Sequence, residues 1–596
     1  MILQALKDYY DRKAADPESG IAPLGWEWKE IPFVFVIAEN GKFLQIEDTR
    51  EVVGKKKRAK PFRVPQSVVR TRNPAAFTLW DKAEYAFPGI AKGTDADKKH
   101  ALFLDCLDKY SGELPSVLSV RRFLTEHFDE RELRGNDIWN EYVQSGAVAT
   151  FKIAGHELPV PCENEFFRIY NEHLLSTSEP PDGICLVTGH RDVVSRTHHK
   201  IVGVVGTDKG RGSLVSFNWD AAESFGKEQG YNSPIGKKAE FAYTTALNTL
   251  LASSRQKMSV GDATMVFWSE RNTVLEDEFA DLFREPDKDD PDRGIVAVER
   301  LLASVKTGSF SRENEETRFY VLGLAPNVTR IAVRFWHVGT VAEMERRFAD
   351  WFENLQIVHG PKDKEHLSLT RLLLSTAPYN KDFQKWKANI SPNLAGAVMR
   401  SILEGTQYPA ILLSSAILRI KTEHEVTYPR AKIIKAFINH NLNQERKLTV
   451  SLDKGNANVG YRLGRLFAVL EQIQLAANDY KSPNATIRDK FYAAASSTPA
   501  VVFGNLMRLK NYHLAKLSKT GFYEGLIGEI LYRDSEHPGV QSFPTHLSLQ
   551  DQGMFAIGYY HQRQDFFAGK QTKKDDDSAK NTKSAPEGAE QQELSF

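Results

Sequence analysis

The sequence predicts an α+β protein, in which a mixed, β-rich N-terminal region is followed by a C-terminal helical bundle. Short β-branched and aromatic runs separated by glycine turns predict strands in the N-terminal part. From about Leu394, apolar residues recur at helical spacing in one segment after another. The 596 residues suffice for two or three domains, and we expect boundaries at 1–285, 294–390, 391–568 and a low-complexity, disordered tail at 569–596.

Composition excludes several classes of protein. The formal net charge is only +1, with 41% hydrophobic and 26% charged residues, so any nucleic-acid surface must come from segregation of charge. Cys106, Cys162 and Cys185 form no CxxC pair, which predicts a reducing environment without a disulfide framework. No apolar run reaches the length of a membrane span and the N-terminus lacks a signal-peptide pattern, so we expect a cytoplasmic protein without membrane contact.

The N-terminal elements follow from local patterns. Residues 1–16 form an amphipathic helix, and Ile31–Gln45 is predicted to be two strands joined at Asn40-Gly41. We expect residues 98–172 to be helical and charged. Aromatic residues at 80, 85 and 87 are interpreted mainly as core.

The stretch Lys55–Asn73 carries eight cations and no carboxylate. Its prolines, Pro61 and Pro65, predict an extended loop rather than a helix. Lysines that reach phosphates release counterions, whereas arginine and asparagine can read base edges. A solvated basic loop is the alternative. The predicted DNA-binding residues are Lys55, Lys56, Lys57, Arg58, Lys60 and Arg63, with Arg70, Arg72 and Asn73 contacting base edges.

The segment Ile184–Leu251 mixes short β-branched runs with glycine turns and closes on a helix. Its loop Gly206–Gly212 lacks the spacing of a Walker motif but could wrap a phosphate with backbone amides. A hairpin turn with exposed cations explains it equally well. The candidate nucleic-acid contacts here are Lys200, Lys209 and Arg211.

The second half begins after a charged, proline-broken linker, Glu285–Gly294. Paired strands at Phe319–Leu324 and Thr329–Trp336 precede a predicted helix at Val341–Leu355. Predicted bundle helices follow at residues 411–420, 430–439, 461–477 and 503–517. We expect exposed cations on these helices at Arg430, Lys432, Lys435, Arg462, Arg465, Arg508, Lys510 and Lys516. Among them, Arg462, Arg465, Arg508 and Lys510 are possible contacts to a single strand.

Catalytic motifs are missing from the sequence. The cluster His190, His198 and His199 could suggest a metal-dependent nuclease, but no second acidic cluster has metal-ligand spacing. There is also no HExxH, GxSxG or Walker motif. We therefore predict a protein that is not an enzyme and has no metal or other cofactor, with a nuclease using His190–His199 as the alternative.

Several blocks of the sequence carry a family resemblance. These blocks are CLVTG at 185–189, His199–Gly203, Leu214–Asn218, Glu223–Gly230, Ala242–Asn248, Phe319–Trp336 and Gln552–Phe567. In this order, the chain resembles the large subunit of the type I-C CRISPR surveillance complex (Cascade) up to about residue 567.

The resemblance implies a set of functions and partners. A member would recognise the protospacer-adjacent motif in double-stranded DNA, aid duplex opening and stabilise the displaced strand. Its partners would be the CRISPR guide RNA, backbone and handle-binding subunits, and a helicase-nuclease that it recruits. A small subunit would arise from an internal start in the same frame, at Met399, or at Val450 if its codon is GUG. A plain RNA-binding scaffold without motif reading is a third alternative.

Overall fold

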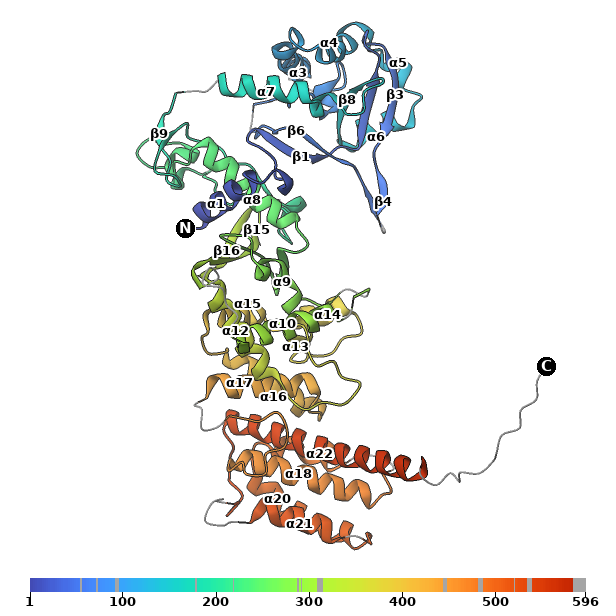
Figure 1. The fold of residues 1–596 in the computed structure, drawn as a ribbon, viewed down its shortest axis with the longest axis vertical. Helices are drawn as coiled ribbons and strands as arrows, with labels where there is room; N and C mark the ends of the chain where they lie inside the picture. The colour runs from blue at the N-terminus through green and yellow to red at the C-terminus, as the bar shows by residue number, and fades with distance from the viewer. Residues whose placement is uncertain are drawn as a thin grey trace, which may run out of the picture. The chain divides into compact units, whose positions relative to one another are not determined.

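A computed structural model describes residues 1–53, 56–70, 73–91, 96–176, 180–217, 219–286, 289–290, 292–307, 315–442, 447–480, 486–518, 520–532 and 539–582, with the backbone alone at 53, 56, 96, 209 and 569–582. The chain divides into two compact units (Figure 1). The first comprises Met1–Ser253 and Ala325–Ala332, and the second Ser254–Leu324 and Val333–Phe596. Sheets with helices in the N-terminal half and helices alone from about residue 360 confirm the predicted α+β class.

A four-stranded sheet forms the centre of the N-terminal core of the first unit. Its strands are β2 (Phe33–Ile37), β3 (Phe43–Asp48), β7 (Trp80–Lys82) and β8 (Val148–Ile153), in the order β3-β2-β8-β7. The antiparallel β2–β3 pair confirms the predicted hairpin. The expectation that residues 98–172 are helical is wrong at β8, which pairs in parallel with β2. A strand that is buried almost throughout has no alternating pattern by which to recognise it.

Helices complete the core around this sheet. They are α2 (Ala83–Ala86), α3 (Ala96–Ser111), α4 (Pro115–Arg122), α5 (Glu130–Leu133), α6 (Asp137–Ser145) and α7 (Asn164–Ser176). Phe35 of β2 lies within 4.8 Å of the Phe87 ring and 5.5 Å of Tyr142, measured between ring centroids. Trp80, Tyr85 and Phe87 are all buried, so their interpretation as core residues is confirmed.

The basic stretch after β3 contains two short strands, β5 and β6. β4 (Glu51–Val53) pairs with β5 (Lys56–Arg58), and β6 (Pro61–Pro65) pairs with β1 (Trp26–Glu30), both antiparallel. The predicted extended conformation is correct, and the predicted loop is wrong only where the chain forms β5 and β6, because residues 66–70 lie outside any strand. The prolines Pro61 and Pro65 occupy the two ends of β6 in a two-stranded sheet, where strands tolerate a missing amide donor.

The remainder of the first unit is a glycine-rich region closed by a helix, as predicted. Two-residue strands pair as β9 (Gly183–Ile184) with β10 (Arg191–Asp192), and as β11 (Ile201–Val202) with β12 (Arg211–Gly212). Helix α8 (Lys237–Ala252) follows and packs against the N-terminal helix α1 (Ile2–Ala14).

The second unit begins with a sheet of order β13-β14-β15-β16. The strands are β13 (Lys257–Val260), β14 (Ala263–Ser269), β15 (Arg318–Asn327) and β16 (Arg330–Thr340), so the predicted strand pair is confirmed. Helix α12 (Val341–Leu355) has the predicted bounds and starts at a capping box formed by Thr340 and Glu343. The expected boundary near 285–294 lies between α9 (Val274–Phe283) and α10 (Arg293–Thr307), which pack together within this unit.

Helices alone follow in the second unit. They are α13 (Leu369–Leu374), α14 (Phe383–Ala388), α15 (Leu394–Glu404), α16 (Ala410–Glu423), α17 (Tyr428–Asn441), α18 (Val459–Ala476), α19 (Ile487–Ala495), α20 (Pro499–Leu514), α21 (Gly521–Leu531) and α22 (Leu549–Thr582). These include all four predicted bundle helices. Glycines allow α18 and α22 to touch, because a Cβ at Gly464 would lie 2.0 Å from the Phe555 carbonyl oxygen.

Two expectations concern the whole chain. Helix α22 continues to Thr582, and residues 583–596 of the expected disordered tail lie outside the described residues, so the tail and the three-domain division stay predictions. In the part of the chain that the structure describes, no helix is both long and apolar enough to cross a membrane.

Candidate nucleic-acid interface

The basic segment begins as a narrow hairpin, β4–β5, which projects from the sheet (Figure 1). Its register pairs Val52 with Lys57 and Glu51 with Arg58. The side chains of Lys57, Arg58 and Lys60 are exposed, and among the described residues none of the three forms a salt bridge. Lys55 and the side chain of Lys56 lie outside the described residues. The hairpin therefore presents at least three cations to solvent.

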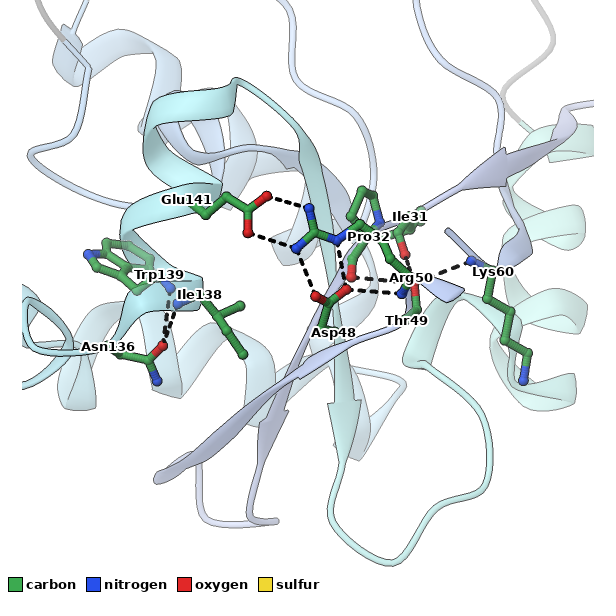
Figure 2. Close-up of polar contacts among 10 residues, drawn as sticks. All are labelled: Ile31, Pro32, Asp48, Thr49, Arg50, Lys60, Asn136, Ile138, Trp139 and Glu141. Atoms are coloured by element: carbon green, nitrogen blue, oxygen red, sulfur yellow. Dashed lines mark hydrogen bonds and ion pairs between the residues drawn. The ribbon is translucent and has the colours of Figure 1, made fainter. Parts of the chain in front are cut away.

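Thr49 fixes the base of this hairpin, as Figure 2 shows. Its hydroxyl donates to the Ile31 carbonyl at 2.6 Å and accepts from the Lys60 amide at 3.3 Å. The Ile31 amide in turn donates to the Lys60 carbonyl at 3.2 Å. One side chain therefore joins the strand entering the hairpin to the strand leaving it.

Arg50 binds the hairpin base to helix α6 (Figure 2). Its guanidinium donates to Asp48 at 2.7 and 2.8 Å, and to both carboxylate oxygens of Glu141. Hydrogen bonds from Arg50 hold the pKa of Asp48 and of Glu141 below their usual values, and Lys57 contributes to both shifts. Helix α6 begins at Asn136, whose Oδ1 accepts from the Ile138 and Trp139 amides.

No sequence pattern identifies this base. Its only signal in the sequence is a threonine and an arginine a few residues before the basic run. Their partners Ile31 and Glu141 are distant along the chain, so no local pattern could identify them.

Arg63 and Arg70 are engaged within the protein. The Arg63 guanidinium lies 4.1 Å from the Phe167 ring centroid. Arg70 donates to the Ala75 carbonyl at 2.7 Å and forms an ion pair with the fully buried Asp81. Its guanidinium also lies 3.8 Å from the ring centroids of Phe77 and Tyr85. Nearby, Asn73 is exposed, and Arg72 lies outside the described residues.

A second group of cations surrounds β1. Burial lowers the pKa of Lys29, Glu27 opposes this shift, and the charges of Arg211 and Lys82 lower the pKa further. Three cations are therefore close enough to interact, and only Arg211 among them was predicted. Lys29 and Lys82 lie on short strands without any charge run, so the sequence gives no signal for them.

Two further cations of the first unit were predicted to contact nucleic acid, Lys200 and Lys209. Lys200 is exposed and its Nζ donates to the Ser213 hydroxyl at 2.6 Å. The backbone of Lys209 lies in a 3-10 turn at Asp208–Gly210, but its side chain lies outside the described residues.

The cations predicted to be exposed on the bundle helices are mostly buried, which corrects that expectation. The exposed fractions are 4% for Arg430, 3% for Lys432, 2% for Lys435, 1% for Arg462 and 0% for Arg465. Arg465 donates to Glu529 at 2.6 Å and to Gln562 at 3.1 Å. A side chain with no solvent exposure cannot reach a phosphate in this conformation, so Arg462 and Arg465 are not accessible as single-strand contacts.

These buried cations bind carbonyl groups at helix ends. Lys432 and Lys435 donate to Leu355 and Asn354, in the last turn of α12. Arg462 donates to Ile530 in the last turn of α21 at 3.0 Å. Because the last carbonyls of a helix have no partner within it, a cation at this end is stabilising. Burial lowers the pKa of Lys432 and Lys435 to about 8.

Helix α20 and the turn that follows it at Lys516 keep their expected character. Arg508 and Lys516 are exposed, and Lys510 is half-buried. The Lys516 ammonium lies 4.4 Å from the Tyr512 ring centroid. This helix therefore retains cations that are accessible to a partner.

The histidine cluster is built into the first unit. His198 is buried, with its Nδ1 2.6 Å from the Tyr243 hydroxyl. The ring nitrogens of His199 lie 3.1 Å from Glu240 and 2.8 Å from the Ser67 carbonyl. The pKa of His199 is raised. Burial lowers this pKa, but the carboxylate of Glu240 raises it by more. Within the described residues, no group of three or more histidine, cysteine or acidic side chains could hold a metal ion.

Comparison with known proteins gives the family. No curated protein matches the chain. A family model described as CRISPR-associated protein (Cas_Csd1) matches residues 6–567, which is nearly the whole chain. The match covers the basic hairpin, both units and most of the helical region. The chain therefore belongs to the CRISPR-associated Cas_Csd1 family, the large subunit of type I-C Cascade.

Proposed function

We propose that this chain recognises the protospacer-adjacent motif in double-stranded DNA, aids duplex opening, stabilises the R-loop and recruits a separate helicase-nuclease. Its partners would be the guide RNA, the backbone and handle-binding subunits, and a small subunit. The observation that carries the proposal is the β4–β5 hairpin, which presents Lys57, Arg58 and Lys60 on a base fixed by Thr49 and Arg50. An exposed cationic hairpin held at its base by hydrogen bonds suits a DNA groove, because its base need not be ordered on binding.

Phosphate contacts and base contacts divide between two parts of the segment. We assign Lys57, Arg58 and Lys60 to phosphates, together with Lys55 and Lys56. Base reading falls to Asn73 and Arg72, and the Arg70–Asp81 ion pair fixes the chain just before them. Arg70 would have to leave a buried carboxylate to reach a base, so we assign it a positioning role. The cations Lys29, Lys82 and Arg211 would extend the positive surface.

The phosphate contacts are tested by salt dependence. In K57Q/R58Q/K60Q, the slope of log K against log salt for duplex DNA should fall by about three units if each cation meets one phosphate. The matched control K42Q/K109Q/K306Q removes three exposed cations elsewhere and should leave the slope unchanged. Equal slopes for the two variants would contradict the proposal.

Motif recognition separates this proposal from a plain RNA-binding scaffold. With the assembled complex and matched guide, changing the flanking motif should weaken duplex binding, and N73A should reduce that discrimination because asparagine reads adenine edges. A scaffold would bind all flanking sequences alike. No observation on the described residues favours the nuclease alternative, and the proposed role is non-catalytic.

The internal start also becomes testable. Met399 lies in the middle of α15 and is fully buried, whereas Val450 lies in a loop before α18. A fragment starting at Val450 would contain α18 to α22 intact, including the close α18–α22 contact. We therefore propose Val450 as the start. A C-terminal antibody should detect that fragment in cells carrying the native locus, and detection of full-length chain alone would contradict the proposal.

A further inference from the structure

A short surface segment of the second unit, 378–389, interleaves aromatic rings with cations and surrounds helix α14. Tyr379 is 67% exposed and Phe383 is 47% exposed. Lys381, Lys385 and Lys387 add three positive charges, and none of them forms a salt bridge within the described residues. Neither the basic hairpin nor the predicted bundle contacts include this segment.

The other polar side chains of the segment are used to close its own fold. Asp382, its one carboxylate, accepts from the amides of Gln384 and Lys385 at 2.9 and 3.3 Å. Asn380 accepts from the Asp382 amide at 2.9 Å, and Asn389 donates to the Pro378 carbonyl at 3.0 Å. The rings and ammonium groups, together with the exposed side chain of Gln384, are therefore available to a ligand.

Two of the rings pack against each other. Trp386 packs edge-on against Tyr379, with 5.0 Å between the ring centroids. A tyrosine held in this way offers a fixed surface on which a flat base can stack.

We infer that segment 378–389 is a stacking platform for single-stranded DNA. Bases would stack on Tyr379 and Phe383, while Lys381 and Lys385 meet the phosphates between them. Every base has a π-face, so such a platform binds strands without reading sequence. The inference deepens the proposed function and rests on it, because a displaced strand has a different sequence at every target.

A cavity beside the platform fits the same ligand. It has a volume of about 450 Å³, is lined by Gln384 and Lys387 of α14, and continues to Asp262 and Asn393. Cavities of this size accept small planar molecules. A base that leaves the stack would enter this cavity beside α14.

The stacking contacts are tested with the full-length chain and a short, fluorescein-labelled DNA strand of mixed sequence. In Y379A/F383A, affinity measured by fluorescence anisotropy should fall at least about tenfold, since each base–aromatic stack contributes substantially. The control F522A/Y532A removes a phenylalanine and a tyrosine that are 61% and 66% exposed, and should retain full affinity.

The phosphate contacts are tested in K381Q/K385Q/K387Q. Its salt slope for the single strand should fall by about two units, whereas the control K42Q/K109Q/K306Q should show no change. Duplex binding by the platform variants should remain as in the parent protein. The hairpin variant K57Q/R58Q/K60Q should show the opposite pattern, so failure of the platform and failure of the hairpin proposal are distinguishable.

Crosslinking tests the contact in the unmodified chain, so it does not depend on whether a variant folds. Ultraviolet crosslinking of the unmodified chain to oligothymidine should label the peptide that contains Tyr379 and Phe383. Unchanged single-strand affinity in both platform variants, or crosslinks confined to other peptides, would overturn the inference. A loss seen only with RNA of the same sequence would overturn it in favour of an RNA surface, and a loss for DNA at least as large as for RNA supports it.

Discussion

In the first unit, Lys57, Arg58 and Lys60 extend into solvent from a two-stranded hairpin. In the second unit, Arg462 and Lys435 are buried between helices. The same two residue types thus serve opposite purposes: at the hairpin they leave charge available for a polyanion, and in the bundle they satisfy backbone carbonyls of the protein itself.

The difference follows from what surrounds each cation. A two-stranded hairpin has no second layer that could cover its side chains. A packed helix end instead leaves carbonyl groups unpaired, and a long cation from a neighbouring helix can reach them. Spacing and charge alone do not distinguish these situations.

The largest expected effect is at a buried helix-end cation. R462M removes the donors to Ile530 and Asn456, which leaves two carbonyls without these partners. We expect a loss of about 3 kcal/mol in the free energy of unfolding, measured by urea titration with circular dichroism. The exposed Arg508 is the control, because R508M should change that free energy by less than about 0.5 kcal/mol. Equal effects would contradict the assignment of Arg462 to the interior.

The stability of the second unit should also depend on pH, because of one buried histidine, His561. Burial, and secondarily the charge of Lys435, lower the pKa of His561 to about 3. His561 then stays neutral in the folded state while the unfolded state binds a proton below about pH 6.5, so stability falls as pH decreases from there toward 3. Between pH 6.5 and 4.5 we expect a loss of about 2 kcal/mol from this residue. H561Q should flatten that part of the stability profile, and an unchanged profile would contradict the prediction.

A smaller effect is expected at the base of the hairpin. R50A removes the bonds to Asp48 and Glu141, so the hairpin loses its attachment to α6 and duplex affinity should fall about threefold to tenfold. Because Arg50 lowers the pKa of both carboxyls, these contacts are present at neutral pH and are lost as pH falls through the lowered values. R131A, at an arginine whose side chain is 84% exposed, should bind duplex DNA normally.

The smallest effect on stability is expected for the exposed hairpin cations. K57Q/R58Q/K60Q should change the free energy of unfolding by less than about 0.5 kcal/mol while it weakens DNA binding, because these side chains are exposed. Thermal unfolding of the variant beside the parent chain checks this. A large loss of stability would show that the hairpin cations serve the fold, as the buried cations of the bundle do.

Local signals explain which elements could be predicted from the sequence. The Asn40-Gly41 turn specified the β2–β3 hairpin, and helical apolar spacing specified α12 and the bundle helices. β8 was missed because a strand buried on both faces has no alternation. In the candidate site, the charge run located the hairpin, but the attachment of Arg50 to Glu141 spans 91 residues of sequence and has no local signature.

The sequence by itself determined the α+β class, the family and the position of the basic segment, because turns, periodicity and charge runs are local properties. Only the tertiary structure decided which cations are available to a ligand. Arg465 and Arg508 look alike in sequence, yet one is fully buried against Glu529 and the other is exposed. Burial depends on which distant segments pack over a side chain, and charge and spacing along the chain do not specify that packing.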